Sequence, residues 1–196
     1  MANRQANIDT KTRETQIHVE VDLDGTGESR VDTGIGFFEH MLNHLAKHSL
    51  CDIIVDCKGD LEVDAHHTVE DVGIAIGKAI GKALGDKAGL VRYGHAVVPM
   101  DEALVMTALD ISGRGSLVYD VEVSKEKVGQ FDTELAPEFF KALALNAGIN
   151  CHIRSLSTGN AHHVIEATFK SFARALQQAL AISDKVTGVP STKGTL

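Results

Sequence analysis

The sequence predicts an α+β fold built from two copies of one strand-strand-helix-strand-helix unit, each copy a small sheet with helices on one face. Segments with alternating apolar residues are interleaved with segments of helical periodicity, which indicates a mixture of strands and helices. The pattern starts again after residue 93, which indicates an internal duplication. We expect a single domain over residues 1–196, with half-repeats at about 10–93 and 94–186 and a C-terminal loop at 187–196.

The first half begins with a strand at residues 15–23, because Ile17, Val19 and Val21 alternate with polar side chains. Residues 24–27, with the sequence Asp-Gly-Thr-Gly, predict a turn that leads into a short return strand. Apolar residues at helical spacing then predict a helix, which is followed by another strand and a long second helix. In chain order, these four elements are expected at residues 29–33, 37–46, 50–55 and 66–84.

The long helix of the first half carries a glycine at every fourth position, at Gly73, Gly77, Gly81 and Gly85. Each glycine costs roughly 1 kcal/mol relative to alanine inside a helix, so a row of them needs a compensating contact. Such a row forms a smooth groove that another backbone can approach closely, and we expect the helix to pack on a sheet through it. The row therefore indicates packing rather than catalysis.

The second half repeats the order of strands and helices. Paired strands are expected at residues 97–100 and 103–110, with a third at 116–123. A helix, a strand and a long amphipathic helix complete the half, at residues 137–147, 149–153 and 161–182. Each half alone would expose one face of its sheet and its strand edges. We therefore expect the halves to pack together and the chain to form oligomers.

The motif His-His-x-x-Glu opens a predicted helix at residue 66 and again at residue 162. On a helix, residues three and four apart are neighbours, so the glutamate faces both histidines. Imidazole and carboxylate groups at this spacing bind divalent transition metals. Adjacent histidines point about 100° apart on a helix, so we expect each pair to serve two ions that other copies of the motif complete. A single copy of the motif would indicate surface decoration or helix capping, whereas its repetition favours metal binding. The six residues are His66, His67, Glu70, His162, His163 and Glu166.

Three more of the ten histidines lie on one face of the first helix, at positions 40, 44 and 48. Superposition of the halves places His40 over Glu138, so the second half offers a carboxylate where the first offers an imidazole. The histidines that we expect to be structural or at the surface are His18, His44, His95 and His152.

Several basic and hydroxyl residues could gather around a phosphate group, because Arg and Lys with hydroxyls and loop amides form a typical anion site. One of them, Lys170, lies one helical turn after Glu166. The full set is Arg92, Arg114, Lys170, Ser191 and Lys193.

Composition excludes several classes of function. The net charge of −8 argues against a nucleic-acid binder, because that affinity depends on clustered Lys and Arg. No G-x-G-x-x-G or P-loop supports nucleotide binding. No segment has the length or composition of a membrane span or a signal peptide. Three cysteines without a C-x-x-C pair favour reduced thiols and a cytoplasmic location.

The sequence resembles the imidazoleglycerol-phosphate dehydratase family of histidine biosynthesis over nearly its whole length. The matching blocks include Gly34–Leu42 (GIGFFEHML), Asp64–Gly73 (DAHHTVEDVG) and Asn160–Lys170 (NAHHVIEATFK). The resemblance implies a hydro-lyase that converts imidazole glycerol phosphate to imidazole acetol phosphate and water. It also implies a duplicated α+β unit, a 24-subunit shell, and two Mn²⁺ ions per active site held between subunits.

The resemblance also assigns roles to residues of this chain. It implies proton transfer by Glu14 or His48, and a catalytic role for Glu166 beside its metal-ligating role. Many family members have histidine at the position of Glu138, but a carboxylate there can still coordinate a metal. The implied metal ligands are His40, His66, His67, Glu70, Glu138, His162, His163 and Glu166. The implied substrate contacts are Glu14, Arg92, Arg114, Lys170, Ser191 and Lys193, the last five around the phosphate.

Two other functions use the same residues. A metal-dependent hydrolase would activate water with these ligands and would turn over phosphate or peptide substrates. A non-catalytic metal-binding shell protein would bind metal in quantity without needing the basic cluster around Arg92.

Overall fold

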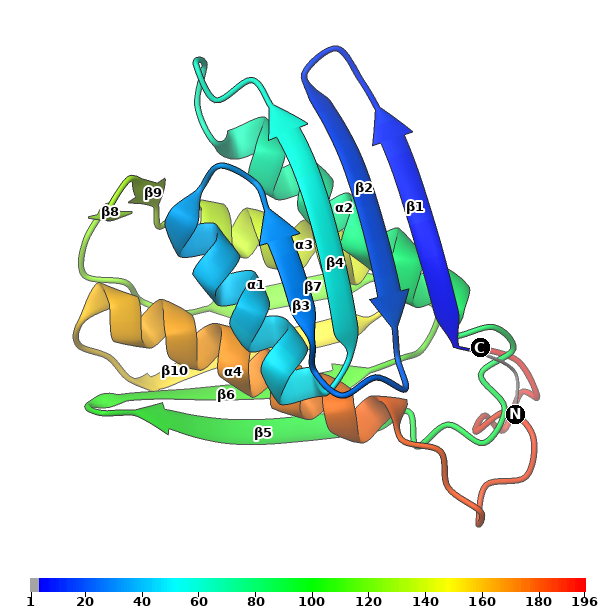
Figure 1. Ribbon diagram of the computed structural model, residues 1–196. Coiled ribbons are helices and arrows are strands. Elements are labelled where there is room, and N and C mark those ends of the chain that lie inside the picture. Colours follow the sequence, from blue (N-terminus) through cyan, green and yellow to red (C-terminus); the bar gives the residue numbers. More distant parts are fainter. Residues whose placement is uncertain (1–3) are drawn as a thin grey trace.

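The computed structural model describes residues 4–196, in which the two halves of the chain fold alike (Figure 1). The first half contains β1 (Gln5–Lys11), β2 (Thr15–Asp22), β3 (Ser29–Asp32), α1 (Gly36–Ser49), β4 (Asp52–Gly59) and α2 (His66–Ala83). The second half contains β5 (Tyr93–Met100), β6 (Ala103–Asp110), β7 (Ser116–Asp120), β8 (Lys127–Val128), β9 (Phe131–Asp132), α3 (Leu135–Ala147), β10 (Asn150–Ser157) and α4 (Ala161–Leu180).

Each half forms a four-stranded sheet of the same topology. The strand orders are β1-β2-β4-β3 and β5-β6-β10-β7, so the halves correspond strand for strand. In both sheets the short third strand pairs in parallel with the strand that follows the first helix, and the other pairs are antiparallel. The duplicated α+β class predicted from the sequence is confirmed.

Two features of the unit were absent from the sequence prediction. β1 lies ahead of the predicted start of the first half at residue 10. Its inward side chains are Ala6, Ile8 and Thr10, which make a weak apolar alternation on an edge strand. The second half also contains the two-residue strands β8 and β9, which are too short for any periodicity. The first half therefore has three strands, not two, before its first helix, and the second half has five, not three.

The helices lie between the two sheets, and each half packs its helices against those of the other (Figure 1). α2 contacts the first sheet on one side and α3 on the other, while α4 contacts the second sheet and α1. A cluster of fully buried phenylalanines fills the centre, and burying each one contributes roughly 1.5–3 kcal/mol. These side chains are Phe38, Phe131, Phe139, Phe140, Phe169 and Phe172. The interleaved helices join the two halves through one continuous core.

The glycine row of α2 packs closely, but against a helix rather than a sheet. A Cβ atom on Gly73 would lie 2.8 Å from the carbonyl oxygen of Phe139, and one on Gly77 would lie 2.6 Å from that of Leu143. Both oxygens belong to α3. The expectation that the row contacts a sheet is therefore wrong, because α2 presents its bulkier residues to the first sheet and its glycines to α3.

The outward faces of the two sheets differ in composition at corresponding positions. On the first sheet, Asp9 lies opposite His18 across β1 and β2. On the second, Val97 lies opposite Met106 across β5 and β6, and the side chain of Val97 is half exposed. Other apolar residues exposed on strands of the second sheet are Tyr93, Val118 and Leu156. The duplication thus kept the fold of the face and changed its surface chemistry.

Residues 187–196 form a loop, as predicted, which lies beside the segment that precedes β5. Within residues 4–196, no helix combines the length and the hydropathy needed to cross a membrane.

Candidate active site

The first turns of α2 and α4 are fixed by side chains that precede each His-His pair. Asn160 Oδ1 accepts a hydrogen bond from the backbone N–H of His162 at 2.9 Å, and Asp64 Oδ1 accepts one from that of His66 at 2.7 Å. Asn160 is thereby the N-cap of α4, whereas α2 has Ala65 at its N-cap and takes its hydrogen bond from Asp64 one residue earlier. The glutamate of each motif then lies one turn further along the same face.

One metal-type cluster combines residues from both halves. His40 comes from α1, whereas His162 and Glu166 come from α4, and their ligand atoms all lie within 4.8 Å of one another. His162 Nε2 is 3.1 Å and His40 Nε2 is 3.3 Å from Glu166 Oε2. Ligand atoms about 2.0–2.2 Å from one metal ion lie roughly 3.0–3.5 Å from each other, so these residues fit a divalent ion. We call this set the α1–α4 cluster.

Glu166 is the most enclosed member of the α1–α4 cluster, with 4% of its surface exposed. Its Oε1 atom accepts a hydrogen bond from Lys170 Nζ at 2.5 Å, which leaves Oε2 for the histidines. Burial raises the pKa of this carboxyl. The hydrogen bond from Lys170, the charge of His44 and the hydrogen bond from His162 outweigh burial and bring the pKa to about 2. Glu166 is therefore an anion under all ordinary conditions, as a metal ligand must be.

A second cluster forms around the other histidine of the α4 motif. His163 Nδ1 is 3.1 Å from Glu102 Oε2 and 3.8 Å from Asp101 Oδ2. Both carboxylates lie in the turn between β5 and β6. Hydrogen bonds from the backbone N–H groups of Asn160 and Glu102 and from His163 lower the pKa of Glu102 to about 2.

The α2 motif has the matching arrangement. His67 Nε2 is 3.9 Å from Glu14 Oε1, in the turn between β1 and β2, and His67 Nδ1 is 3.0 Å from Asp60 Oδ2. The hydrogen bond to Asp60 raises the pKa of His67. His66 Nε2 is 3.7 Å from Glu70 Oε2.

Adjacent histidines diverge, as their helical spacing predicts. The His66 and His67 rings lie at 88° to each other with centroids 6.2 Å apart, and the His162 and His163 rings lie at 78° and 6.1 Å. Within each pair, one histidine faces the glutamate of its own motif and the other faces a hairpin carboxylate.

Glu138 lies on the first turn of α3, close to where α3 crosses α2. Gly73 of α2 faces Phe139. Glu70 lies three residues before Gly73 on α2, which places the two residues on the same side of the helix. The Glu138 carboxylate pairs with Lys141 Nζ at 3.3 Å. By the internal duplication, Glu138 with His66 and Glu70 corresponds to the α1–α4 cluster, and we call this set the α2–α3 group.

His44 differs from its expected role as a surface residue. Its Nε2 atom is 3.3 Å from His40 Nε2 and 3.3 Å from Glu166 Oε1, so it lies beside the α1–α4 cluster, on the Glu166 oxygen that Lys170 also contacts. Burial, together with the charge of Lys170, lowers its pKa to about 4. The expectation was wrong because α4 packs over this face of α1, which a helical pattern in α1 alone does not reveal. His48 stacks on His44 with ring centroids 5.6 Å apart, and burial also lowers its pKa.

Four of the five predicted phosphate residues lie at the opposite end of the molecule from the α1–α4 cluster. Arg92 forms two hydrogen bonds to the Asp110 carboxylate, at 2.6 and 3.1 Å, and donates to the Pro190 carbonyl at 2.8 Å. Arg114 follows Asp110 on an exposed loop, in which Gly113 lies against the C-terminal Leu196. Ser191 and Lys193 form a turn directly after Pro190.

Lys170 lies apart from these four residues, with the α1–α4 cluster. The Arg92 N–H donates to the carbonyl of Ala179, near the C-terminal end of α4. Thirteen residues of helix separate Ala179 from Glu166, a distance of about 20 Å. One chain therefore does not bring its metal-type residues and the Arg92 cluster into a single site.

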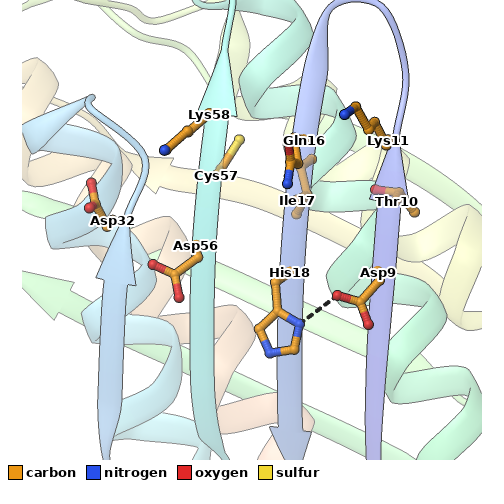
Figure 2. Close-up of a pocket in the computed structure, with 10 residues that line it drawn as sticks. All are labelled: Asp9, Thr10, Lys11, Gln16, Ile17, His18, Asp32, Asp56, Cys57 and Lys58. Atoms are coloured by element: carbon orange, nitrogen blue, oxygen red, sulfur yellow. Dashed lines mark hydrogen bonds and ion pairs between the residues drawn. The ribbon is translucent and has the colours of Figure 1, made fainter.

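One cavity lies beside the histidine motifs, and another lies over the outer face of the first sheet. A space of about 690 Å³ is lined by Phe37, Ala65 and Phe131, among others. Phe37 packs edge-on against His162 with centroids 5.1 Å apart, and Ala65 precedes His66, so this cavity adjoins both motifs. Figure 2 shows a different hollow of about 320 Å³ over the first sheet, where His18 lies 2.8 Å from Asp9. His18 is held by carboxylates there, in the structural role expected for it, and His95 and His152 are exposed.

Sequence reasoning missed four residues in or beside these clusters: His44, Asp60, Asp101 and Glu102. Glu102 had a detectable pattern, because the offset of 88 residues that relates Asp22 to Asp110 also relates Glu14 to Glu102. No pattern in the sequence identifies Asp60 or Asp101 as members of these clusters.

Comparisons with known proteins agree along the whole chain. The family model described as imidazoleglycerol-phosphate dehydratase matches residues 33–176. Proteins of that name from Desulforamulus reducens and Acetivibrio thermocellus are 58% and 55% identical, over 100% and 99% of this chain and all of each relative. The crystal structure of imidazoleglycerol-phosphate dehydratase from Staphylococcus aureus has a TM-score of 0.84 at 41% identity, covering 91% of this chain and 99% of its own. The enzyme from Pyrococcus furiosus in complex with (S)-C348 gives a TM-score of 0.83 at 35% identity, covering 96% and 100%.

Proposed function

This chain belongs to the imidazoleglycerol-phosphate dehydratase family and is a hydro-lyase of histidine biosynthesis, and we propose that it dehydrates imidazole glycerol phosphate with two manganese ions. The observation that carries the metal proposal is the convergence of His40 from one half with His162 and Glu166 from the other. Imidazole and carboxylate ligands suit manganese, zinc and related divalent ions.

The residues proposed to hold the metals form two groups. His40, His162 and Glu166 hold one ion, and His66, Glu70 and Glu138 hold the other. His67 and His163 point away from their own glutamates, and we propose that each completes a metal centre in another copy of the chain. When bound, the metals supply Lewis-acid stabilisation of negative charge that develops on the substrate.

The remaining residues position the substrate and move protons. Lys170 holds Oε1 of Glu166, so that Oε2 faces His40 and His162. Glu14, which is exposed beside His67, is proposed to take the carbon-bound proton. His48 is proposed to donate a proton to the departing hydroxyl oxygen. Arg92, Arg114, Ser191 and Lys193 bind the phosphate, and that binding energy orients the imidazole ring.

We propose that each active site is shared between subunits of a homo-oligomer, with 24 subunits as the family resemblance implies. The support from the structure is the separation of about 20 Å along α4 between the α1–α4 cluster and the Arg92 end. A site that binds both ends of one small substrate then takes the α1–α4 cluster from one chain and its phosphate contacts from another. The apolar outer face of the second sheet is the surface that favours association.

We also propose a cytoplasmic location. Cys51, Cys57 and Cys151 are free and buried, and burial raises the pKa of each thiol. Such thiols persist in a reducing compartment.

Metal removal tests the proposal directly. Chelator-stripped protein is expected to lose dehydratase turnover and to regain it with added Mn²⁺. Glu166→Gln is expected to lower kcat by orders of magnitude, whereas Lys193→Ala mainly raises KM for the phosphate substrate. Full turnover by metal-free protein contradicts the metal proposal, and a fall in kcat alone for Lys193→Ala contradicts the phosphate assignment. Phosphate esters assayed in parallel would expose a hydrolase.

A further inference from the structure

We propose that two carboxylates, Asp60 and Glu102, act as positioning residues for the second histidine of each His-His pair. Each carboxylate holds the Nδ1–H of that histidine, so that its Nε2 atom is the one offered to a metal. The inference rests on the proposed function, in which His67 and His163 complete metal centres in other copies of the chain. It adds two residues that the predicted site omits, and it names the nitrogen through which each histidine binds.

In the second half, His163 is held by a residue that makes two further hydrogen bonds of its own. The Oε2 atom of Glu102 is 3.1 Å from His163 Nδ1, and its Oε1 atom accepts a hydrogen bond from the backbone N–H of Asn160 at 2.6 Å. The backbone carbonyl of Glu102 accepts another from Ser157 Oγ at 2.8 Å. Glu102 therefore ties the ring of His163 to the N-cap of α4 and to the end of β10.

The loop before α4 leaves room for this contact. A Cβ atom on Gly159 would lie 2.3 Å from both Cγ and Oε1 of Glu102, so any larger residue would push the carboxylate away. Gly159 directly precedes Asn160, whose N–H the same carboxylate accepts. The approach of Glu102 to the start of α4 thus depends on a glycine at this position.

In the first half, Asp60 makes the equivalent contact from a different place in the chain. Its Oδ2 and Oδ1 atoms are 3.0 and 3.3 Å from His67 Nδ1. Its backbone carbonyl accepts a hydrogen bond from the N–H of Val63 at 2.8 Å, which closes a turn at the start of the loop between β4 and α2. That loop comprises residues 60–65, whereas the loop between β10 and α4 comprises residues 158–160 and includes no carboxylate.

Both halves therefore hold the same ring nitrogen, although with carboxylates that do not correspond in the duplication. A metal-ligating histidine commonly donates its second ring N–H to a carboxylate, which fixes the tautomer and the direction of the ring. The first-half counterpart of Glu102 is Glu14, whose Oε1 atom lies 3.9 Å from the other nitrogen of His67, Nε2. The use of Asp60 frees Glu14 from holding the ring, in agreement with its proposed role in proton transfer.

The alternative is a metal ion held directly between His163 Nδ1, Glu102 and Asp101, whose ligand atoms lie close together. Asp101 is 3.8 Å from that nitrogen, which is beyond hydrogen-bond distance, and its side chain is largely exposed. The contact with Glu102 is instead aligned as a hydrogen bond, and the same bond recurs between Asp60 and His67. One hydrogen bond formed independently in both halves favours the positioning role.

The test begins with the manganese affinity of the full-length protein. Glu102→Gln is expected to weaken Mn²⁺ binding about 10–100-fold, as measured by electron paramagnetic resonance of the unbound ion. Glutamine has one acceptor oxygen, so it can accept from Asn160 or from His163 but not from both. With its NH₂ group facing His163, the ring must carry its proton on Nε2, which removes the ligand atom. Asp60→Ala is expected to weaken binding by a similar factor.

A second readout needs no metal. ¹⁵N spectra of histidine-labelled, metal-free protein at about pH 9, where the rings are neutral, show which ring nitrogen carries the proton. The two signals are identified by their absence from His67→Gln and His163→Gln. In wild type both rings should be protonated at Nδ1, whereas His163 in Glu102→Gln should be protonated at Nε2.

Asp9→Asn is the matched control, because it removes a carboxylate 2.8 Å from His18 Nδ1 on the outer face of the first sheet (Figure 2). It should leave Mn²⁺ affinity unchanged. Weaker binding by Glu102→Gln with an unchanged His163 tautomer would make Glu102 a ligand and overturn the positioning role. If Glu102→Gln does not fold, Asp60→Ala and the His67 signal decide in the same way. Unchanged affinity and tautomer in a folded variant overturn this inference alone, whereas a wild-type protein that binds no Mn²⁺ overturns the proposed function.

Discussion

Gly77→Ala tests the close crossing of α2 and α3, on which the α2–α3 group depends. The added Cβ atom would lie 2.6 Å from the Leu143 carbonyl oxygen and 2.9 Å from the Asn146 Cβ. Both contacts are far inside van der Waals separation, and one of them is with backbone, so α3 must move. Overpacking of this kind costs about 1–3 kcal/mol.

Helix propensity opposes that cost. Alanine is favoured over glycine inside a helix by about 1 kcal/mol. We therefore expect Gly77→Ala to lower the free energy of unfolding by up to about 2 kcal/mol, and Tm by roughly 2–4 °C per kcal/mol for a chain of this size. Displacement of α3 should also move Glu138 relative to Glu70 and weaken metal binding at the α2–α3 group.

The measurement is thermal and denaturant unfolding at one fixed protein concentration, because association shifts apparent stability. Gly36→Ala is the matched control, since an added Cβ there meets no atom within 4 Å, and it should be neutral or slightly stabilising. Gly81→Ala is intermediate, with its nearest contact at 3.2 Å. The reasoning is refuted if Gly77→Ala is as stable as Gly36→Ala.

Three further predictions concern the tail, a turn and the sheet surfaces. Arg92→Lys removes the paired hydrogen bonds to Asp110, so it should raise KM and speed proteolysis of the C-terminal tail; unchanged cleavage would mean that Arg92 does not hold it. Asp52 has a lowered pKa because, although burial raises it, backbone N–H groups of Glu28, Thr26 and Gly27 donate to its carboxylate. Asp52→Asn should therefore destabilise the protein at neutral pH, and the difference from wild type should vanish as pH falls from about 4 through the lowered folded pKa; a pH-independent difference in denaturant titrations would exclude this cause. Val97→Glu on the second sheet should reduce the oligomer mass measured by light scattering, whereas Asp9→Asn at the corresponding place on the first sheet should not; equal effects would remove the apolar face from the interface.

Most elements of the fold could be predicted, because strands and helices leave a period in the sequence. β2 was recognised from Ile17, Val19 and Val21, which face the core beside β4. β1 was missed because an edge strand needs less apolar surface, and Ala6 and Thr10 give it little. The ends of elements differ from the prediction by a few residues. The strand expected at residues 50–55, for example, is β4 at Asp52–Gly59.

The site was predictable to the extent that it is repeated. The two His-His-x-x-Glu motifs identify themselves because duplication preserves both their residues and their place at a helix start. Glu138 was found only by superposing the halves, and Glu102 could have been found in the same way. His44 could not, because what places it beside the α1–α4 cluster is a helix more than a hundred residues later in the chain.

The sequence by itself determined the duplicated α+β architecture, the two histidine motifs and the family, since these depend on local period and on repetition. The tertiary structure decided that α1 packs on α4 and α2 on α3, so that the α1–α4 cluster combines His40 of the first half with His162 and Glu166 of the second. It also decided that the glycine row faces a helix, and that the phosphate residues lie a helix length from the α1–α4 cluster. The helix pairing depends on side-chain volumes at the crossings, such as Gly73 of α2 against Phe139 of α3, and no local pattern encodes which distant surface such a residue meets.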